Sequence, residues 1–169
     1  DPGGSWTRIA PARAVPRRSV GVGSAVRFFL SPYDPNLIYL LDDNAVKRSD
    51  DGGATWKLDP ALEQQATWNG AIPVSTNDPG VLGDFSDVVL TDMQFDPNLP
   101  MLRFAIGYGG AFVTIDGAIW TRLLHTGALS GRPTSCYYDG ISPTSPSLYV
   151  ALGGRSLIRI SGFQTTQIF

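Results

Sequence analysis

The sequence predicts an all-β protein built from repeated four-stranded antiparallel sheets. Alternating apolar runs, such as residues 37–41, end in short polar turns, and the same order of strand, turn and strand recurs along the chain. The 19 glycines and 13 prolines in 169 residues suit many short strands joined by tight turns. Because they also interrupt most windows of helical length, we expect no helix.

Composition narrows the function classes. With 43% hydrophobic and 17% charged residues the chain is globular, and its net charge of −2 gives no basic footprint for nucleic acid. Cys136 is the single cysteine and His125 the single histidine, so an intrachain disulfide is excluded and a metal site is not expected. No apolar run approaches the roughly 20 residues of a membrane span. We therefore expect no cofactor, metal, nucleic-acid partner or membrane span.

The clearest local signal is a polar turn, residues 49–56, between two predicted strands. Asp51 can accept hydrogen bonds from backbone N–H groups of the turn, and the glycines after it allow positive φ values. Ser49 and Thr55 can bridge the two sides of the turn, and Trp56 offers a large apolar body to bury. We expect this turn to fold on itself and to insert its tryptophan into a core.

This octet resembles the Asp-box repeat, Ser/Thr-x-Asp-x-Gly-x-Thr-Trp/Phe. Its fixed positions are filled here by Ser49, Asp51, Gly53, Thr55 and Trp56. The families that carry the repeat include sialidases, xyloglucan-active glycosidases, sortilin-type receptors and a photosystem assembly factor. In all of them the box lies between the third and fourth strands of a β-propeller blade, on the rim away from the ligand face. The resemblance therefore implies β-propeller blades, about three in this chain, and a structural role for the box.

Three other stretches resemble the box in part. The positions that they retain are Asp1, Gly3 and Trp6 in the first, Thr114, Asp116 and Trp120 in the second, and Ser161 in the third. The residues that open a box, Ser49, Thr114 and Ser161, stand 65 and 47 residues apart. Propeller repeats usually run about 40–50 residues, so the longer interval predicts an insertion.

We expect residues 1–169 to form a single partial propeller domain. The repeats divide this domain into blades. The predicted parts are the end of one blade (1–9), two blades (25–58 and 86–124), a last blade (133–169) and an insertion loop (59–85). Propellers need about 4–8 blades to close, so three require partners. Either the chain is a fragment whose other blades lie elsewhere, which its start inside a box favours, or two copies join into a ring of about six blades.

The candidate ligand site lies in the insertion, because long loops without secondary structure are commonly functional. Trp68, Asn69, Asp84 and Asp87 offer an aromatic face for sugar C–H groups, and an amide and carboxylates for hydroxyls. The alternative is a surface loop in which Trp68 packs locally.

Asp84 and Asp87 are also weak candidates for a catalytic acid/base pair. Residues 83–87 are loosely similar to the Gly-Asp-x-Gly-Gly segment of xyloglucan-active glycosidases, but Ser86 and Asp87 replace the glycine pair. In that family the second carboxylate lies in another propeller domain. The three arginines that surround a carboxylate in sialidases are not recognisable either.

We therefore expect a non-catalytic binding or scaffolding propeller that recognises a protein or a glycan through its channel-face loops. The alternative is a fragment of a secreted glycoside hydrolase of the xyloglucanase or sialidase type. The resemblance implies an extracellular or cell-envelope location.

Overall fold

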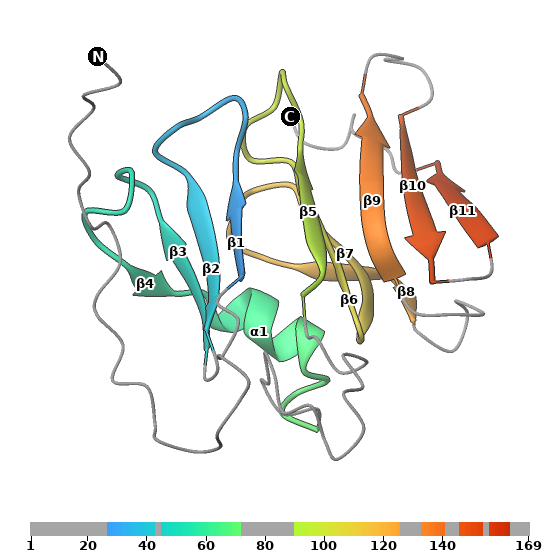
Figure 1. Cartoon of the computed structure of the whole chain (residues 1–169), viewed down its shortest axis with the longest axis horizontal. Coiled ribbons are helices and arrows are strands. Elements are labelled where there is room, and N and C mark those ends of the chain that lie inside the picture. The colour runs from blue at the N-terminus through green and yellow to red at the C-terminus, as the bar shows by residue number, and fades with distance from the viewer. Residues whose placement is uncertain are drawn as a thin grey trace, which may run out of the picture.

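The computed structural model describes residues 27–42, 45–71, 90–125, 133–140, 146–153 and 156–162. Within these ranges the chain forms three antiparallel sheets that stand side by side (Figure 1). The prediction of an all-β fold made of antiparallel sheets is confirmed.

Each sheet follows the order of the chain, so that every strand pairs with its sequence neighbour. The first contains β1 (Arg27–Leu30), β2 (Ile38–Asp42), β3 (Ala45–Ser49) and β4 (Lys57–Leu58). The second contains β5 (Asp92–Phe95), β6 (Arg103–Gly107), β7 (Gly110–Thr114) and β8 (Thr121–His125). The third contains β9 (Pro133–Asp139), β10 (Ser147–Leu152) and β11 (Ser156–Ser161).

The third sheet thus has three strands in the described residues, one fewer than the predicted unit. In the first two sheets a turn with an aspartate and a tryptophan leads into the fourth strand. The sequence after Ser161 has neither residue, and residues 163–169 lie outside the described part of the chain.

One helix contradicts the expectation of none. Helix α1 (Pro60–Ala66) follows β4 directly, within the segment predicted to be a loop. The Asp59 side chain caps it by accepting a hydrogen bond from the Leu62 backbone N–H at 3.0 Å. Pro60 begins the helix, where its missing N–H costs nothing. Leu62 and Ala66 are buried, so burial of one apolar face holds this short helix in place.

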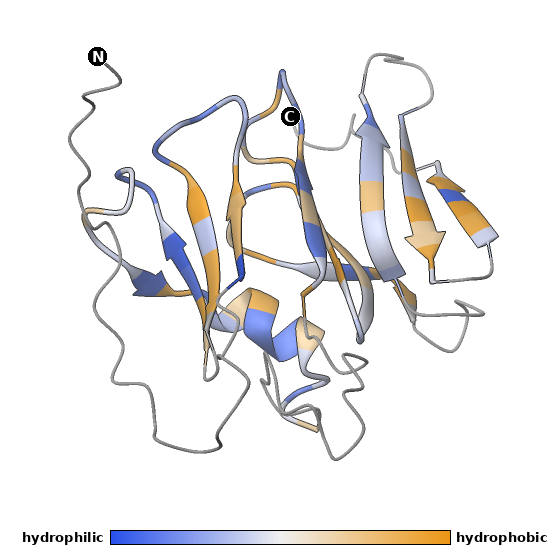
Figure 2. Cartoon of the chain, viewed as in Figure 1, coloured by the Kyte–Doolittle hydropathy of each residue, from blue (hydrophilic) through white to orange (hydrophobic). Residues whose placement is uncertain are grey.

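Two apolar clusters fill the spaces between the sheets. The first lies between the first two sheets and includes Tyr39, Phe112 and the buried residues of α1. The second lies between the second and third sheets and includes Phe104 and Tyr138. Figure 2 shows the hydrophobic residues that run through β1, β2 and β10.

The tryptophans at the ends of the two polar turns, Trp56 and Trp120, differ in burial. Trp120 is 3% exposed and its ring meets Tyr39 edge-on, with centroids 6.3 Å apart. Trp56 is only half-buried and belongs to neither apolar cluster, so the expectation that it inserts into a core is wrong. It precedes β4, a two-residue strand whose residues are both exposed, so it stands at the margin of the first sheet.

Polar bonds join the second sheet to the third. The Asp92 carboxylate accepts the backbone N–H of Cys136 at 2.8 Å, and the Thr91 hydroxyl donates to the Pro133 carbonyl at 3.1 Å. Burial, followed by the charge of Asp92, raises the pKa of the Cys136 thiol. The thiol is therefore protonated at neutral pH.

Candidate functional site

Helix α1 spans the end of the molecule between the first and second sheets (Figure 1). Its first turn is bonded to β3: the Glu63 carboxylate accepts the Val46 backbone N–H at 3.0 Å, and the Asp59 N–H donates to the Val46 carbonyl at 2.8 Å. The side chains of Asp59 and Glu63 thus each accept a backbone N–H group, from Leu62 and Val46 respectively. Both carboxylates therefore help to hold the helix in place.

The last turn of α1 ends in a Schellman motif with an unusual residue at its left-handed position. The Asn69 N–H donates to the Gln64 carbonyl at 2.8 Å, and the Trp68 N–H donates to the Gln65 carbonyl at 3.4 Å. The left-handed position is usually glycine, but here Trp68 occupies it with φ 52°, and Asn69 follows with φ 57°. They are the two non-glycine residues with positive φ in the described ranges, and such strain is typical of functional sites.

The indole of Trp68 explains why the backbone tolerates this conformation. Its Nε1–H donates to the Gly109 carbonyl, in the turn between β6 and β7, at 3.0 Å. The helix end approaches this turn so closely that a Cβ at Gly109 would lie 2.5 Å from the Ala66 carbonyl oxygen. Trp68 as a whole residue nevertheless remains 39% exposed. It therefore presents part of a fixed aromatic surface to solvent.

Arg122 of β8 completes the cluster. Its guanidinium carbon lies 5.6 Å from the ring centroid of Trp68 and 5.7 Å from that of Phe112. Its Nη2 donates to the Gln65 carbonyl at 2.8 Å, which supplies a donor to the last turn of the helix. Trp68, Asn69, Gly109 and Arg122 are called the Trp68 site below.

The structure brings together two of the predicted ligand residues, Trp68 and Asn69, and adds two that sequence reasoning missed. Neither Gly109 nor Arg122 was among the predicted site residues. Asp84 and Asp87 lie outside the described residues, as do Asp1, Gly3 and Trp6.

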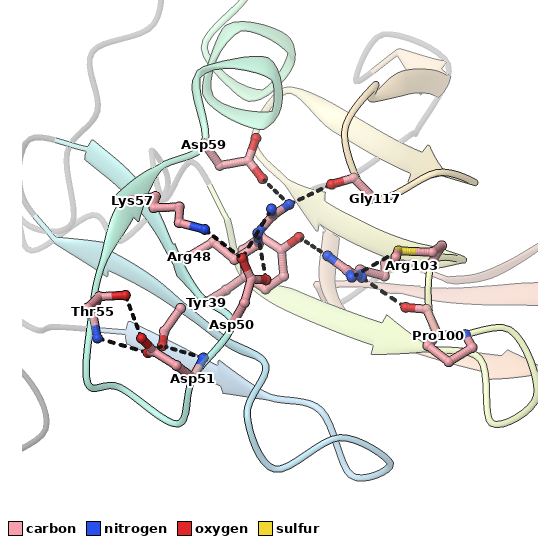
Figure 3. Close-up of polar contacts among 12 residues, drawn as sticks. Tyr39, Arg48, Asp50, Asp51, Thr55, Lys57, Asp59, Pro100, Arg103 and Gly117 are labelled. Atoms are coloured by element: carbon pink, nitrogen blue, oxygen red, sulfur yellow. Dashed lines mark hydrogen bonds and ion pairs between the residues drawn. The ribbon is translucent and has the colours of Figure 1, made fainter.

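A second polar cluster joins the first two sheets, with Tyr39 between Arg48 and Arg103 (Figure 3). Arg103 is 5% exposed, and its Nη1 donates to the Tyr39 hydroxyl at 2.8 Å. Its Nε donates to the Pro100 carbonyl at 3.1 Å. Burial raises the pKa of Tyr39, so its hydroxyl stays neutral beside the cation.

Arg48 continues this cluster toward the surface. Its Nη1 donates to the Gly117 carbonyl of the second sheet at 2.6 Å, and its Nε pairs with Asp50 at 3.0 Å. Gly117 has φ +70°, and a Cβ there would lie 3.0 Å from the Met101 sulfur. The cluster bonds the two sheets together.

The polar turn at residues 49–56 contains the predicted hydrogen bonds. Asp51 accepts the Thr55 N–H at 2.8 Å, and it also accepts the hydroxyls of Thr55 and Ser49. The Ser49 hydroxyl oxygen accepts the Gly53 N–H at 2.8 Å.

The turn at residues 114–120 is similar. Asp116 accepts the Ile119 and Ala118 N–H groups at 2.7 and 2.8 Å, and the Thr114 hydroxyl at 3.0 Å. In both turns the carboxylate is occupied by the turn itself.

These bonds predict a pH effect. The Thr55 hydroxyl, followed by the Thr55 backbone N–H, lowers the pKa of Asp51 from 3.8 to about 2. Because the folded-state pKa is depressed, the stabilisation is present above the unfolded-state pKa and is lost as pH falls toward about 2. We expect the Asp51 carboxyl ¹³C resonance to titrate with a midpoint near 2 in the folded protein. A midpoint of 3.8 or above would contradict the hydrogen bonds of this turn.

Other site types find no support in the described residues. No three His, Cys, Asp or Glu side chains gather there as a metal site would require. No helix in the described part of the chain has the length and apolar composition needed to cross a bilayer. His125, the single histidine of the sequence, is the last residue of β8.

Comparisons with known proteins bear on the fold. No protein-family model matches the sequence, and no curated protein matches it. The structure is similar to a GH74 xyloglucanase from Xanthomonas campestris, with TM-score 0.51 and 19% identity over 85% of this chain. It also matches YCF48 from Cyanidioschyzon merolae (TM-score 0.41, 19% identity, 78% of this chain and 38% of that one) and an ancestral GH74 enzyme (TM-score 0.29, 10% identity, 81% and 25%).

The three antiparallel sheets and the likeness to the xyloglucanase define the class of fold: the chain forms blades of a β-propeller. The resemblance to β-propeller proteins predicted from the sequence is confirmed. The chain spans 21% of the length of that enzyme. At this level of identity the likeness describes the fold, and function has to be argued from the site.

Proposed function

We propose that this chain is the part of a β-propeller that binds a glycan or a protein without catalysing a reaction. The observation that carries the proposal is Trp68, a partly exposed indole held at a left-handed backbone position where glycine is usual. Backbone strain of this kind persists only where the surroundings enforce it, and it is found disproportionately at binding sites.

A glycan is the ligand class that the chemistry favours. An exposed indole face stacks on the C–H groups of a sugar ring, and the exposed amide of Asn69 can bind hydroxyls. The nearby carboxylates of Asp59 and Glu63 each accept a backbone N–H group and so contribute to the fold. This use of the acidic groups favours binding over catalysis.

We expect Trp68→Ala to weaken binding of soluble xyloglucan by about tenfold, because a stacking contact is lost. Isothermal titration calorimetry on the intact protein measures this. Tyr137→Ala is the matched control, since Tyr137 is 58% exposed on β9 but lies far along the chain, on the third sheet. Equal affinities of wild type and Trp68→Ala would exclude the Trp68 site as the binding surface.

The second candidate function is that of a glycoside hydrolase fragment, which the likeness in fold to a GH74 xyloglucanase favours. Asp84 would then be the carboxylate to test, with Asp87 beside it. Release of reducing ends from xyloglucan by the intact protein, abolished in Asp84→Asn, would replace the binding proposal with this one.

We also propose the blade division 25–58, 86–124 and 133–169, with further blades supplied by another chain or a second copy. Native mass spectrometry distinguishes these partners, because a second copy doubles the mass of about 18.2 kDa. An extracellular or cell-envelope location accords with a glycan ligand and belongs to the same proposal.

A further inference from the structure

We propose that Arg122 is the positioning residue of the Trp68 site: it holds the indole in its binding orientation and so sets the affinity for glycans. This inference rests on the proposed function. Three independent features of the structure support it, namely the register of β8, the stacking of the guanidinium and its bond to the helix end.

The register of β8 aims Arg122 at the helix. Ala111 of β7 pairs with Leu124, whereas the next residue, Phe112, pairs with Arg122, so a β-bulge leaves Leu123 as the extra residue. Without the bulge Arg122 would pair one residue further on, opposite Val113, whose side chain belongs to the second apolar cluster. The bulge therefore turns Arg122 away from an apolar interior and toward α1.

The bulge also lets two apolar side chains of β8 face the same apolar cluster. Leu123 and Leu124 both pack against the second apolar cluster, although they are adjacent in the chain. In a regular strand adjacent side chains point to opposite faces, so one of them would lie beside the helix instead. Bulges are common at sheet edges, where β8 lies, and next to active sites, and they redirect side chains.

The surroundings of Arg122 fit a positioning role. One ring beside the guanidinium, Phe112, is fully buried and belongs to the core, while the other, Trp68, is partly exposed. The bond from Nη2 to the Gln65 carbonyl fixes the guanidinium against the turn that carries Trp68. Arg122 thus connects the second sheet to the helix end and restricts the movement of the Trp68 indole.

The test uses the Trp68 indole N–H as a readout that needs no ligand. The chain has four tryptophans, so the relevant ¹H–¹⁵N indole signal is the one missing from Trp68→Phe. In Arg122→Met we expect this signal to shift and its solvent exchange to accelerate by about tenfold. Arg122→Lys keeps the charge but not the planar fork, and we expect it to restore part of the protection.

Two controls make the result specific. Arg159→Met replaces an arginine on β11 of the third sheet and should leave the indole signal unchanged. Gly109→Ala should free the indole, because the added Cβ would lie 3.2 Å from Trp68 Nε1 and closer still to the helix backbone. The spectrum of Gly109→Ala therefore shows where the indole signal lies once its hydrogen bond to the carbonyl of residue 109 is lost.

Binding of soluble xyloglucan is then measured on the same variants. We expect Arg122→Met to weaken it by about threefold to tenfold, with Arg122→Lys in between. An unchanged indole signal in folded Arg122→Met would overturn the inference, and so would a freed indole with unchanged affinity. If wild type does not bind xyloglucan, the proposed glycan function fails, and the indole signal alone decides whether Arg122 holds the ring. If Arg122→Met does not fold, Arg122→Lys decides, and an indole exchange rate equal to that of wild type counts against the inference.

Discussion

Phe104→Ala is expected to lower the free energy of unfolding by about 3–5 kcal/mol, the range for removing a buried aromatic side chain. Phe104 is fully buried between the second and third sheets. Its ring lies 4.5 Å from that of Tyr138, at an interplanar angle of 31°. Alanine would lose this stacking contact and leave a cavity at the junction of two blades. Urea unfolding, followed by the loss of β-sheet circular dichroism, measures the change.

Phe28→Ala is the matched control for this prediction. It deletes the same ring from β1, where Phe28 is 63% exposed, and we expect a change within about 0.5 kcal/mol. Similar losses for the two variants would mean that the junction between the second and third sheets is not packed as described.

Tyr39→Phe is expected to cost about 1.5–3 kcal/mol, although it removes a single oxygen atom. The Tyr39 hydroxyl accepts a hydrogen bond from the guanidinium of Arg103, which is itself buried. Without it a buried cation loses one of its acceptors, and this costs more than the bond itself contributes. Thermal and urea unfolding of the variant measure the loss.

A double-mutant cycle separates this bond from packing. In the Arg103→Met background the Tyr39→Phe change should cost much less, because no cation is left without its acceptor. Tyr137→Phe, at an exposed tyrosine of β9, should be near neutral in either background. Additive losses in the cycle would show that the two side chains do not act together.

The parts of the fold that the sequence predicts well are those that depend on local chemistry. The alternating apolar run at residues 37–41 predicted a strand, and β2 (Ile38–Asp42) lies within one residue of it. The turn around Asp51 was predicted in detail, because its donors and acceptors lie within a few residues of one another. These local hydrogen bonds do not depend on how the sheet packs against its neighbours.

Helix α1 was missed although its start is marked in the sequence. Asp59 before Pro60 is a strong signal for the beginning of a helix, but the helix has only seven residues. A segment this short is not stable through helix propensity alone. Its stability comes from burial of Leu62 and Ala66 between two sheets, and that burial depends on tertiary contacts.

The Trp68 site was predicted only in part for the same reason. Trp68 and Asn69 stand out in the sequence as an aromatic residue beside an amide. Arg122 and Gly109 meet them only when the second sheet packs against α1. The β-bulge that turns Arg122 toward the helix has no signature in the alternation of β8, where two leucines follow the arginine.

The burial of Cys136 gives the molecule a reporter of its own motion. Its thiol is the only one in the chain, and it is buried and held protonated at the junction of the second and third sheets. The nucleophile in alkylation is the thiolate, so Cys136 reacts after the sheets have separated and its thiol has become exposed to water and can ionise. The rate of alkylation in native buffer therefore counts how often this junction opens, without a label or an engineered residue. In one experiment it would tell whether neighbouring blades part singly or only when the whole chain unfolds.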